Sequence, residues 1–272
     1  MRSHNEPERQ AKRILINHDT HITHKDEEVG MNVVQTKNLT RIFGSGAAQV
    51  VALDHVSLHV GHGEFVAVMG PSGCGKSTLL HLIGGLDRPT EGSVMIEGQD
   101  LSALDDDALT DLRRKRIGFI FQFFNLIPTL NALDNTALPL VLGGTKPAEA
   151  QERAEEWLKR LNVAERRAHR PEELSGGERQ RIAIARALVT EPSLILADEP
   201  TGNLDSQAAT DFTSLLRETV DRWERSILLV THDDRISSYA DRVLQMKDGR
   251  ILNEQHNQIS TEQVATGESA HA

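Results

Sequence analysis

A glycine-rich run in the first third of the chain combines backbone freedom with a lysine and hydroxyl side chains. It reads Gly70, Pro71, Ser72, Gly73, Cys74, Gly75, Lys76, Ser77 and Thr78. Residues 70–77 fit the phosphate-binding pattern G-x-x-x-x-G-K-[ST] without a mismatch, between an apolar run and a predicted helix. The glycines let successive N–H groups face one anion, Lys76 would neutralise the β- and γ-phosphates, and Ser77 offers oxygen to Mg²⁺. This phosphate loop predicts a nucleotide site; the alternative is a glycine turn that caps a helix.

Two adjacent carboxylates, Asp198 and Glu199, end an apolar run over residues 194–197. Successive strand residues point to opposite faces, so the two acids can take different roles. Asp198 is predicted to hold the Mg²⁺ shell, and Glu199 to accept a proton from the water that attacks the γ-phosphate. The alternative is a pair of solvated acids at a strand end.

A second candidate anion site, Ser175, Gly176 and Gly177, stands directly before the helical pattern of residues 178–188. A helix N-terminus presents unpaired N–H groups, and the serine adds a hydroxyl. One chain thus carries two candidate phosphate-binding sites. A well-capped helix is the structural alternative, and it leaves the two glycines unexplained.

The elements that position these residues alternate between short apolar runs and longer amphipathic stretches. Apolar runs at residues 65–69, 117–121, 194–197 and 226–230 end in polar residues, and helical patterns cover residues 147–163 and 206–223. This alternation predicts an α/β fold with parallel strands, whose functional residues gather at the carboxyl ends of the strands. Residues 1–31 and 253–272 lack the pattern and are predicted to be polar tails; His18, His21 and His24 in the first of them are assigned no metal.

Composition restricts the class of protein. The chain has 272 residues, 38% of them hydrophobic, and no apolar run approaches the roughly 18 residues of a membrane-spanning helix. The N-terminus lacks the apolar core of a secretory signal and Cys74 is the one cysteine, which favours the cytoplasm. A net charge of −10 argues against broad nucleic-acid binding, and the basic run Arg113–Arg116 is predicted to be a solvated helix face.

With the run Leu174–Gln180 (LSGGERQ) in place before its helix, the sequence resembles the ABC ATPases over residues 32–252. The resemblance implies a P-loop NTPase of ABC type, with a parallel-sheet core, an antiparallel β subdomain and an inserted helical subdomain at about residues 100–190. It also implies a head-to-tail dimer, expected to be a homodimer. In the family each of two ATPs lies between the phosphate loop of one subunit and the signature run, residues 174–180, of the other.

The resemblance assigns further residues. Gln122 matches the glutamine that senses Mg²⁺, and His232 matches the histidine that contacts the γ-phosphate. The implied catalytic residues are therefore Glu199, His232 and Gln122, and the implied Mg²⁺ ligands are Ser77, Gln122 and Asp198. Asp205 matches the loop that links the two active sites. Phe43 lies where the family stacks an aromatic ring on adenine, with a place in the core as the alternative.

In finer detail, residues 117–135 and 197–206 look like the lipoprotein-release and macrolide-export branch. That likeness implies an ATPase on the inner face of the plasma membrane, powering a separate permease with a large extracytoplasmic domain. Its cargo would be lipoprotein, peptide or drug-like. Phe123, Phe124, Leu126 and Ile127 would line a socket for the permease, with core packing as the alternative. Alternative functions are a motor that signals to cell-wall enzymes without transport, and a soluble ABC ATPase of DNA repair or translation; the chain lacks the long insertion or second cassette of the last two.

Overall fold

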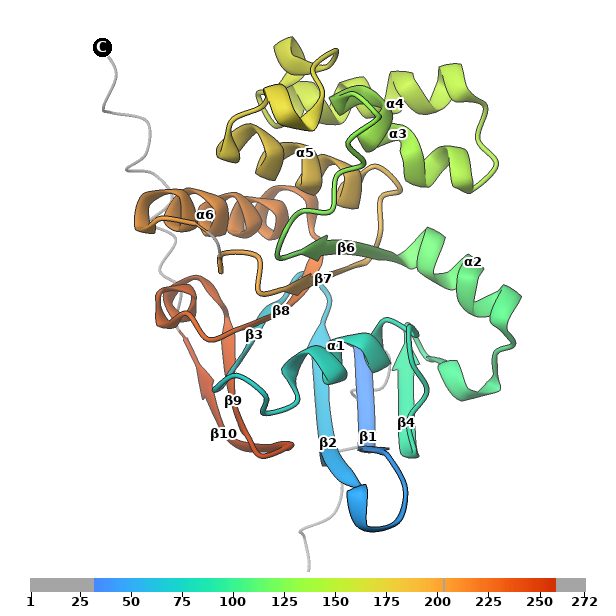
Figure 1. The fold of residues 1–272 in the computed structure, drawn as a ribbon, viewed down its shortest axis with the longest axis vertical. Coiled ribbons are helices and arrows are strands. Elements are labelled where there is room, and N and C mark those ends of the chain that lie inside the picture. The colour runs from blue at the N-terminus through green and yellow to red at the C-terminus, as the bar shows by residue number, and fades with distance from the viewer. Residues whose placement is uncertain (1–31, 203, 258–272) are drawn as a thin grey trace, which may run out of the picture. The chain divides into compact units, whose positions relative to one another are not determined.

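A six-stranded sheet forms the centre of the fold (Figure 1). The computed structural model describes residues 32–202 and 204–257, so the predicted N-terminal tail and most of the predicted C-terminal tail lie outside the described residues. The strand order is β10-β9-β3-β8-β7-β6. The strands are β3 (Phe65–Met69), β6 (Ile117–Phe121), β7 (Leu194–Asp198), β8 (Ser226–Thr231), β9 (Arg242–Lys247) and β10 (Arg250–His256).

Neighbouring strands of this sheet are parallel except β9 and β10. Every residue of β3 and β8 is buried, which explains the apolar sequence of β3 and the apolar run of residues 227–230 in β8: both faces of a parallel sheet are covered. In the register, Met69 pairs with Thr231 and Phe121 pairs with Asp198. The strand order therefore brings the segments that follow β3, β8, β7 and β6 to one edge of the sheet, as the sequence predicts.

A smaller antiparallel sheet of four strands, in the order β2-β1-β4-β5, lies on the other side of helix α1 (Lys76–Ile83) (Figure 1). Its strands are β1 (Asn32–Phe43), β2 (Val50–Gly61), β4 (Glu91–Ile96) and β5 (Gln99–Asp100). Leu79 and Ile83 of α1 pack in one core cluster with Val34 of this sheet and Val66 of the larger one. Helix α1 is thus held from both sides, and so is the loop that precedes it.

The inserted helices are α2 (Asp106–Arg116), α3 (Ala132–Leu142), α4 (Pro147–Arg160) and α5 (Gly176–Leu188). The core strand β6 interrupts them, so the predicted helical span of residues 100–190 contains one strand of the large sheet. Helix α6 (Ser206–Trp223) joins the group at the ring of Trp157, which stands edge-on to Trp223 with centroids 5.0 Å apart. None of the helices in the described part of the chain has the length and apolar character that crossing a bilayer requires.

The last strand extends past residue 252, where the sequence pattern was expected to end. Strand β10 continues to His256, although most of its side chains are exposed. Glu254 holds it through an ion pair of 3.1 Å with Arg242, whose guanidinium is buried and also binds Glu64 and the carbonyl of His59. An edge strand needs few apolar residues, so its polar sequence resembled a tail.

Candidate active site

The phosphate loop is confined between two strands. It leaves β3 after Met69 and enters α1 at Lys76. A Cβ on Gly70 would lie 2.1 Å from the carbonyl oxygen of Met246 in β9. Gly75 has φ of 106°, and a Cβ there would lie 2.3 Å from the carbonyl oxygen of Ala52 in β2. No side chain fits at either position, so the sequence requires glycine for both the turn and the close approach.

Lys76 is nearly buried, with its side chain 5% exposed, and points back over the loop. Its ammonium donates to the carbonyls of Gly70 and Pro71 at 2.9 and 3.1 Å, and lies 3.3 Å from Oε1 of Glu199. A buried ammonium needs such partners to offset its desolvation. Phosphate oxygens can replace them with stronger, charge-assisted bonds.

The two carboxylates contact different groups, but strand alternation is not the reason, because β7 ends at Asp198 and Glu199 lies outside the strand. Oδ1 of Asp198 accepts from the Ser77 hydroxyl at 3.0 Å. Glu199 has left-handed φ of 46°, a strained conformation for a side-chain-bearing residue. Its carboxylate bridges Lys76 and His232, with Oε2 2.7 Å from the His232 Nδ1. Lys76, Glu199 and His232, from three separate segments, therefore form one contiguous polar chain.

Gln122 reaches the same region from the end of β6. A Cβ on Gly202 would lie 2.9 Å from the Gln122 amide nitrogen and 3.4 Å from the carbonyl oxygen of Glu199. The side-chain amide of Gln122 thus lies beside the segment that follows Glu199. Asp205, further along that segment, caps α6 by accepting from the backbone N–H of Ala208 at 2.9 Å.

A hydroxyl and a carboxylate stand together at Ser77 and Asp198. Oxygen donors of this kind fit Mg²⁺, which is commonly held by one or two protein oxygens together with phosphates and water. Across residues 32–202 and 204–257, no group of three or more His, Cys, Asp or Glu side chains could hold a metal ion by itself. The residues therefore fit a metal that enters with a nucleotide.

Ser175 begins α5 with a capping box. Its hydroxyl accepts from the N–H of Glu178 at 3.3 Å, and the Glu178 carboxylate accepts from the N–H of Ser175 at 2.8 Å. Hydrogen bonds from Arg166 and from Ser175 lower the pKa of Glu178 to about 2. Among the described residues, a Cβ on Gly176 would meet no atom within 4 Å, and one on Gly177 only the Gln180 side chain at 4.0 Å. Neither glycine is required by packing within one chain.

Phe43 is 41% exposed, so its alternative place in the core is wrong. Phe43 pairs with Val50 at the end of the β1–β2 hairpin. Val50 is two residues before Ala52, whose carbonyl oxygen lies close to Gly75 of the phosphate loop. Phe43 therefore lies near the phosphate loop. One face of its ring carries the Arg41 guanidinium, 4.6 Å from the centroid.

Within the phosphate loop, Pro71, Ser72 and Gly73 are exposed, whereas Cys74 is buried in the core.

The four residues that the sequence predicts to line a socket for the permease differ in their exposure. Phe123 is 72% exposed and Ile127 is 37% exposed, but Phe124 is buried against Phe212 and Leu126 packs on the core. Phe124 thus follows the alternative of core packing.

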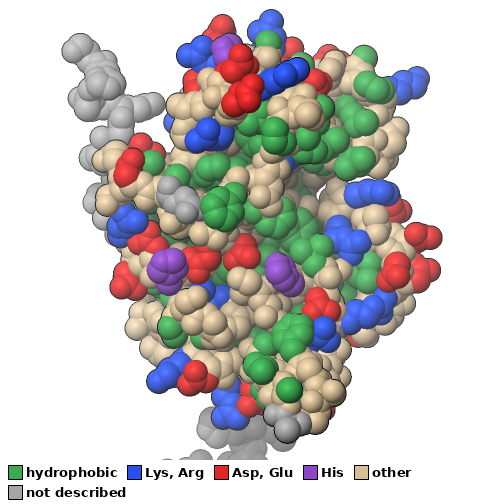
Figure 2. Space-filling model, in the orientation of Figure 1, with side chains coloured by type: hydrophobic (Ala, Val, Ile, Leu, Met, Phe, Trp, Pro, Cys, Tyr) green, Lys and Arg blue, Asp and Glu red, His purple; other side chains and the backbone are tan. Residues whose placement is uncertain are grey.

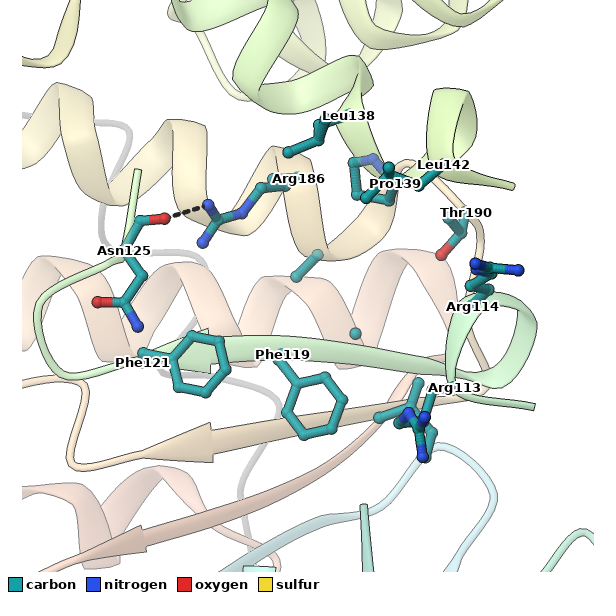
Figure 3. A pocket seen from close by; sticks show the side chains of 13 residues that line it. Arg113, Arg114, Phe119, Phe121, Asn125, Leu138, Pro139, Leu142, Arg186 and Thr190 are labelled. Atoms are coloured by element: carbon teal, nitrogen blue, oxygen red, sulfur yellow. Dashed lines mark hydrogen bonds between the residues drawn. The ribbon is translucent and has the colours of Figure 1, made fainter. Parts of the chain in front are cut away.

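The structure shows a concave site that the sequence analysis missed. A cavity of about 280 Å³ lies between β6 and α3, beside this segment (Figure 3). Among its lining residues are Arg113, Arg114, Phe119, Phe121, Leu138, Leu142 and Arg186. In the space-filling view, hydrophobic side chains gather where α3 and β6 face each other, with basic side chains on α2 beside them (Figure 2). The lining comes from segments separated in the chain, so no local pattern signals it.

The basic run on α2 is not uniformly solvated. Arg113 turns inward and donates to the carbonyl of Gly85 and to Thr110, both at 2.7 Å. Arg114, Lys115 and Arg116 are exposed, as predicted.

Comparisons with known proteins place this geometry in a family. Residues 53–202 match the family model described as ABC transporter. A solved dimer of the ATP-binding cassette MJ0796, in a post-hydrolysis state with ADP and Pi, is 44% identical, with 82% of this chain and 98% of that chain covered and a TM-score of 0.74. A second dimeric structure of MJ0796, a bacterial ABC transporter cassette, is 45% identical at the same coverage and TM-score.

A more distant relative gives the same fold. The structure of cbiO1 from Clostridium perfringens, part of an ABC transporter complex, is 27% identical, with 83% of this chain and 89% of that chain covered and a TM-score of 0.74. The predicted P-loop fold of ABC type is confirmed. The match over more than half of the sequence shows that this chain belongs to the ABC transporter family, as an ABC-type ATPase domain.

Proposed function

We propose that this chain is the ATP-hydrolysing subunit of an ABC transporter, working as a head-to-tail dimer on a separate membrane permease. The observation that carries the proposal is the contiguous arrangement of Lys76, Glu199 and His232 beside Ser77 and Asp198. Lys76 supplies a cation for the phosphates, Glu199 supplies a base for the attacking water, and His232 lies in contact with Glu199. The likeness to MJ0796, solved with ADP and Pi, supports this chemistry.

Each residue has a proposed role. The backbone N–H groups of residues 72–78 cradle the phosphates, and Phe43 stacks on the base. Glu199 accepts the proton of the attacking water, and His232, hydrogen-bonded to it, contacts the γ-phosphate. Ser77, Asp198 and Gln122 would hold Mg²⁺, which when bound neutralises charge on the β- and γ-phosphates.

The dimer completes the site. Gly176 and Gly177 have open space beside them, and the N-terminus of α5 favours an anion. We assign that space to the ATP held by the phosphate loop of the partner subunit, with Asp205 near the junction. MJ0796 is dimeric in the two structures compared above, which supports the same assembly here. A homodimer is the simplest form.

For the membrane partner we propose a permease with a large extracytoplasmic domain, of the lipoprotein-release and macrolide-export branch. It would hold the chain at the cytoplasmic face of the plasma membrane and export or extract lipoprotein, peptide or drug-like cargo. The exposed Phe123 and Ile127 and the nearby cavity offer it a docking surface. A motor that signals to cell-wall enzymes is the second candidate, because it would use the same dimer and the same kind of permease.

Capture of the membrane complex tests this proposal. Tagged Glu199→Gln protein is added with ATP to detergent-solubilised native membranes, and the bound proteins are identified by mass spectrometry. The same variant carrying Lys76→Ala is the matched control, since it is expected to bind the nucleotide far more weakly. A permease with a large extracytoplasmic domain, retained only when ATP can bind, is the expected result. Soluble nucleic-acid partners alone, with the chain absent from membranes, would contradict it.

Lys76→Ala is expected to weaken ATP binding about a hundred-fold, because it removes the charge-assisted bonds to the phosphates. Equilibrium titration with a fluorescent ATP analogue measures the change. Lys115→Ala, which removes a lysine side chain that is 71% exposed, serves as the control and should bind normally. Parent-like affinity in Lys76→Ala would remove Lys76 from the nucleotide site.

A further inference from the structure

The segment that follows Gln122 contains two consecutive residues in the left-handed region, Phe124 with φ of 58° and Asn125 with φ of 45°. Neither is glycine; asparagine adopts this region readily, but phenylalanine rarely does, so Phe124 is strained and must be held by its surroundings. Both carbonyl oxygens accept from one side chain. The guanidinium of Arg186 donates to Phe124 at 2.5 Å and to Asn125 at 2.6 Å. Figure 3 shows the second of these bonds, from the side chain of Arg186 in α5 to the carbonyl of Asn125.

A guanidinium suits this task. Its rigid planar fork holds two N–H groups in fixed directions toward adjacent acceptors, whereas the three donors of a lysine ammonium share one nitrogen on a flexible stem. The two partners that the structure gives Arg186 are neutral carbonyls, so the contact fixes the course of the backbone rather than neutralising a charge. A hydrogen bond with a charged donor is stronger than one between neutral groups, which suits it to holding a strained turn.

The segment connects two parts of the site. At its start, the Gln122 amide lies beside Gly202, in the segment that follows Glu199. Further on, the buried Asn135 of α3 binds the backbone of Ile127 and of Leu130. Arg186 holds the middle of the segment from α5, the helix that begins after Ser175. Arg186 therefore links α5 directly to the backbone two residues from Gln122.

We propose that Arg186 is a positioning residue for ATP hydrolysis: it holds the carbonyls of Phe124 and Asn125 so that Gln122 faces the catalytic centre and follows the movement of α5. The proposal rests on the role assigned to Gln122 under the proposed function. Arg186 also lines the cavity, so an occupant there touches the side chain that holds this turn.

A double-mutant cycle on the full chain tests the inference. Arg186→Met is expected to lower kcat for MgATP about ten-fold, because both charge-assisted hydrogen bonds are lost. KM should change less than about two-fold, because the phosphate loop is untouched. Arg186→Lys, which keeps the positive charge but loses the planar fork, should recover part of the activity. The double variant with Gln122→Ala should be no slower than Gln122→Ala alone, because the two residues act through one element.

A second arginine of the same helix provides the control. Arg181 donates a single bond, at 3.2 Å, to the carbonyl of Leu161. Arg181→Met removes a comparable side chain from α5 without touching the segment after Gln122, and its kcat should match the parent. Thermal unfolding of every variant checks that the fold is kept; if Arg186→Met does not fold, the cycle is run with Arg186→Lys.

The outcomes separate this inference from the proposed function. A folded Arg186→Met variant with the kcat of the parent would overturn the role of Arg186. So would a double variant whose loss of kcat equals the product of the two single losses. Either result would leave the proposed function standing. A Gln122→Ala variant as active as the parent would overturn the role of Gln122 in the proposed function, and the role of Arg186 with it. An equal loss in Arg181→Met would make the effect a general property of α5 and would also overturn the inference.

Discussion

Glu199→Gln lowers ATP turnover by about a thousand-fold, the loss expected when a general base is removed while its shape is kept. Glutamine preserves the volume and one acceptor oxygen but cannot take a proton from water. Glu199 is hydrogen-bonded to His232 at 2.7 Å, so the neutral variant should hold the histidine in nearly the same position. Initial rates of phosphate release at saturating MgATP measure the effect.

The same variant should bind ATP at least as tightly as the parent. Without nucleotide, the Glu199 carboxylate lies 3.3 Å from the Lys76 ammonium and competes with phosphate for it. Glutamine removes both that competition and a negative charge facing the γ-phosphate. Titration with the fluorescent ATP analogue gives the affinity.

Glu224→Gln is the control for Glu199→Gln. Glu224 is also a glutamate with left-handed φ, at 53°, but it ends α6 and is exposed. Its variant should retain full turnover, so the backbone conformation alone does not account for a loss at Glu199. Turnover of Glu199→Gln within ten-fold of the parent, roughly 1.4 kcal/mol, would rule out the role of Glu199 as the base.

Ser175→Arg lowers ATP turnover by a factor of about a hundred or more, while the subunit still binds ATP. The substitution fills the open space at the start of α5 with a long side chain, and in the proposed dimer that space receives the nucleotide of the opposite subunit. The phosphate loop of the same chain is unaltered, so binding to the monomer should be close to that of the parent. Steady-state hydrolysis and analogue titration on the same sample separate the two effects.

Loss of the helix cap must be distinguished from loss of the dimer contact. Ser175 caps α5, and removing such a cap costs about 1 kcal/mol. Asp105→Arg removes the equivalent bond from α2, where Asp105 accepts from Ala108 at 2.8 Å, and should leave turnover unchanged. Full activity in Ser175→Arg would contradict the head-to-tail arrangement.

Mixing two inactive variants gives a positive test of that arrangement. In a dimer of one Ser175→Arg subunit and one Lys76→Ala subunit, both lesions fall in one composite site and the other site is intact. Activity should therefore reappear on mixing, if one intact site supports turnover. A phosphate loop and signature run that act within the same chain would give no intact site in the mixture.

Local sequence was sufficient for the phosphate loop, because its glycine spacing encodes a backbone path that other residues cannot follow. It was also sufficient for the start of α5, where the side chains of Ser175 and Glu178 cap each other within one turn. The short apolar runs within β3, β7 and β8 predicted buried parallel strands, and the polar residues at their carboxyl ends lie at one edge of the sheet. In each case the interaction that decides the structure lies within a few residues, or repeats with the period of the element.

Tertiary structure decided what depends on distant segments. Phe123 and Phe124 are adjacent and identical in type, yet one is exposed and the other buried, because the turn at Phe124 is held by Arg186, 62 positions away. The polar strand β10 is ordered by a buried arginine of its neighbour, which its own composition cannot indicate. The bond between Ser77 and Asp198 joins positions 121 apart, and only the strand order brings them together. Periodicity records which side of an element faces the core, but the partner it meets there depends on how all the elements pack.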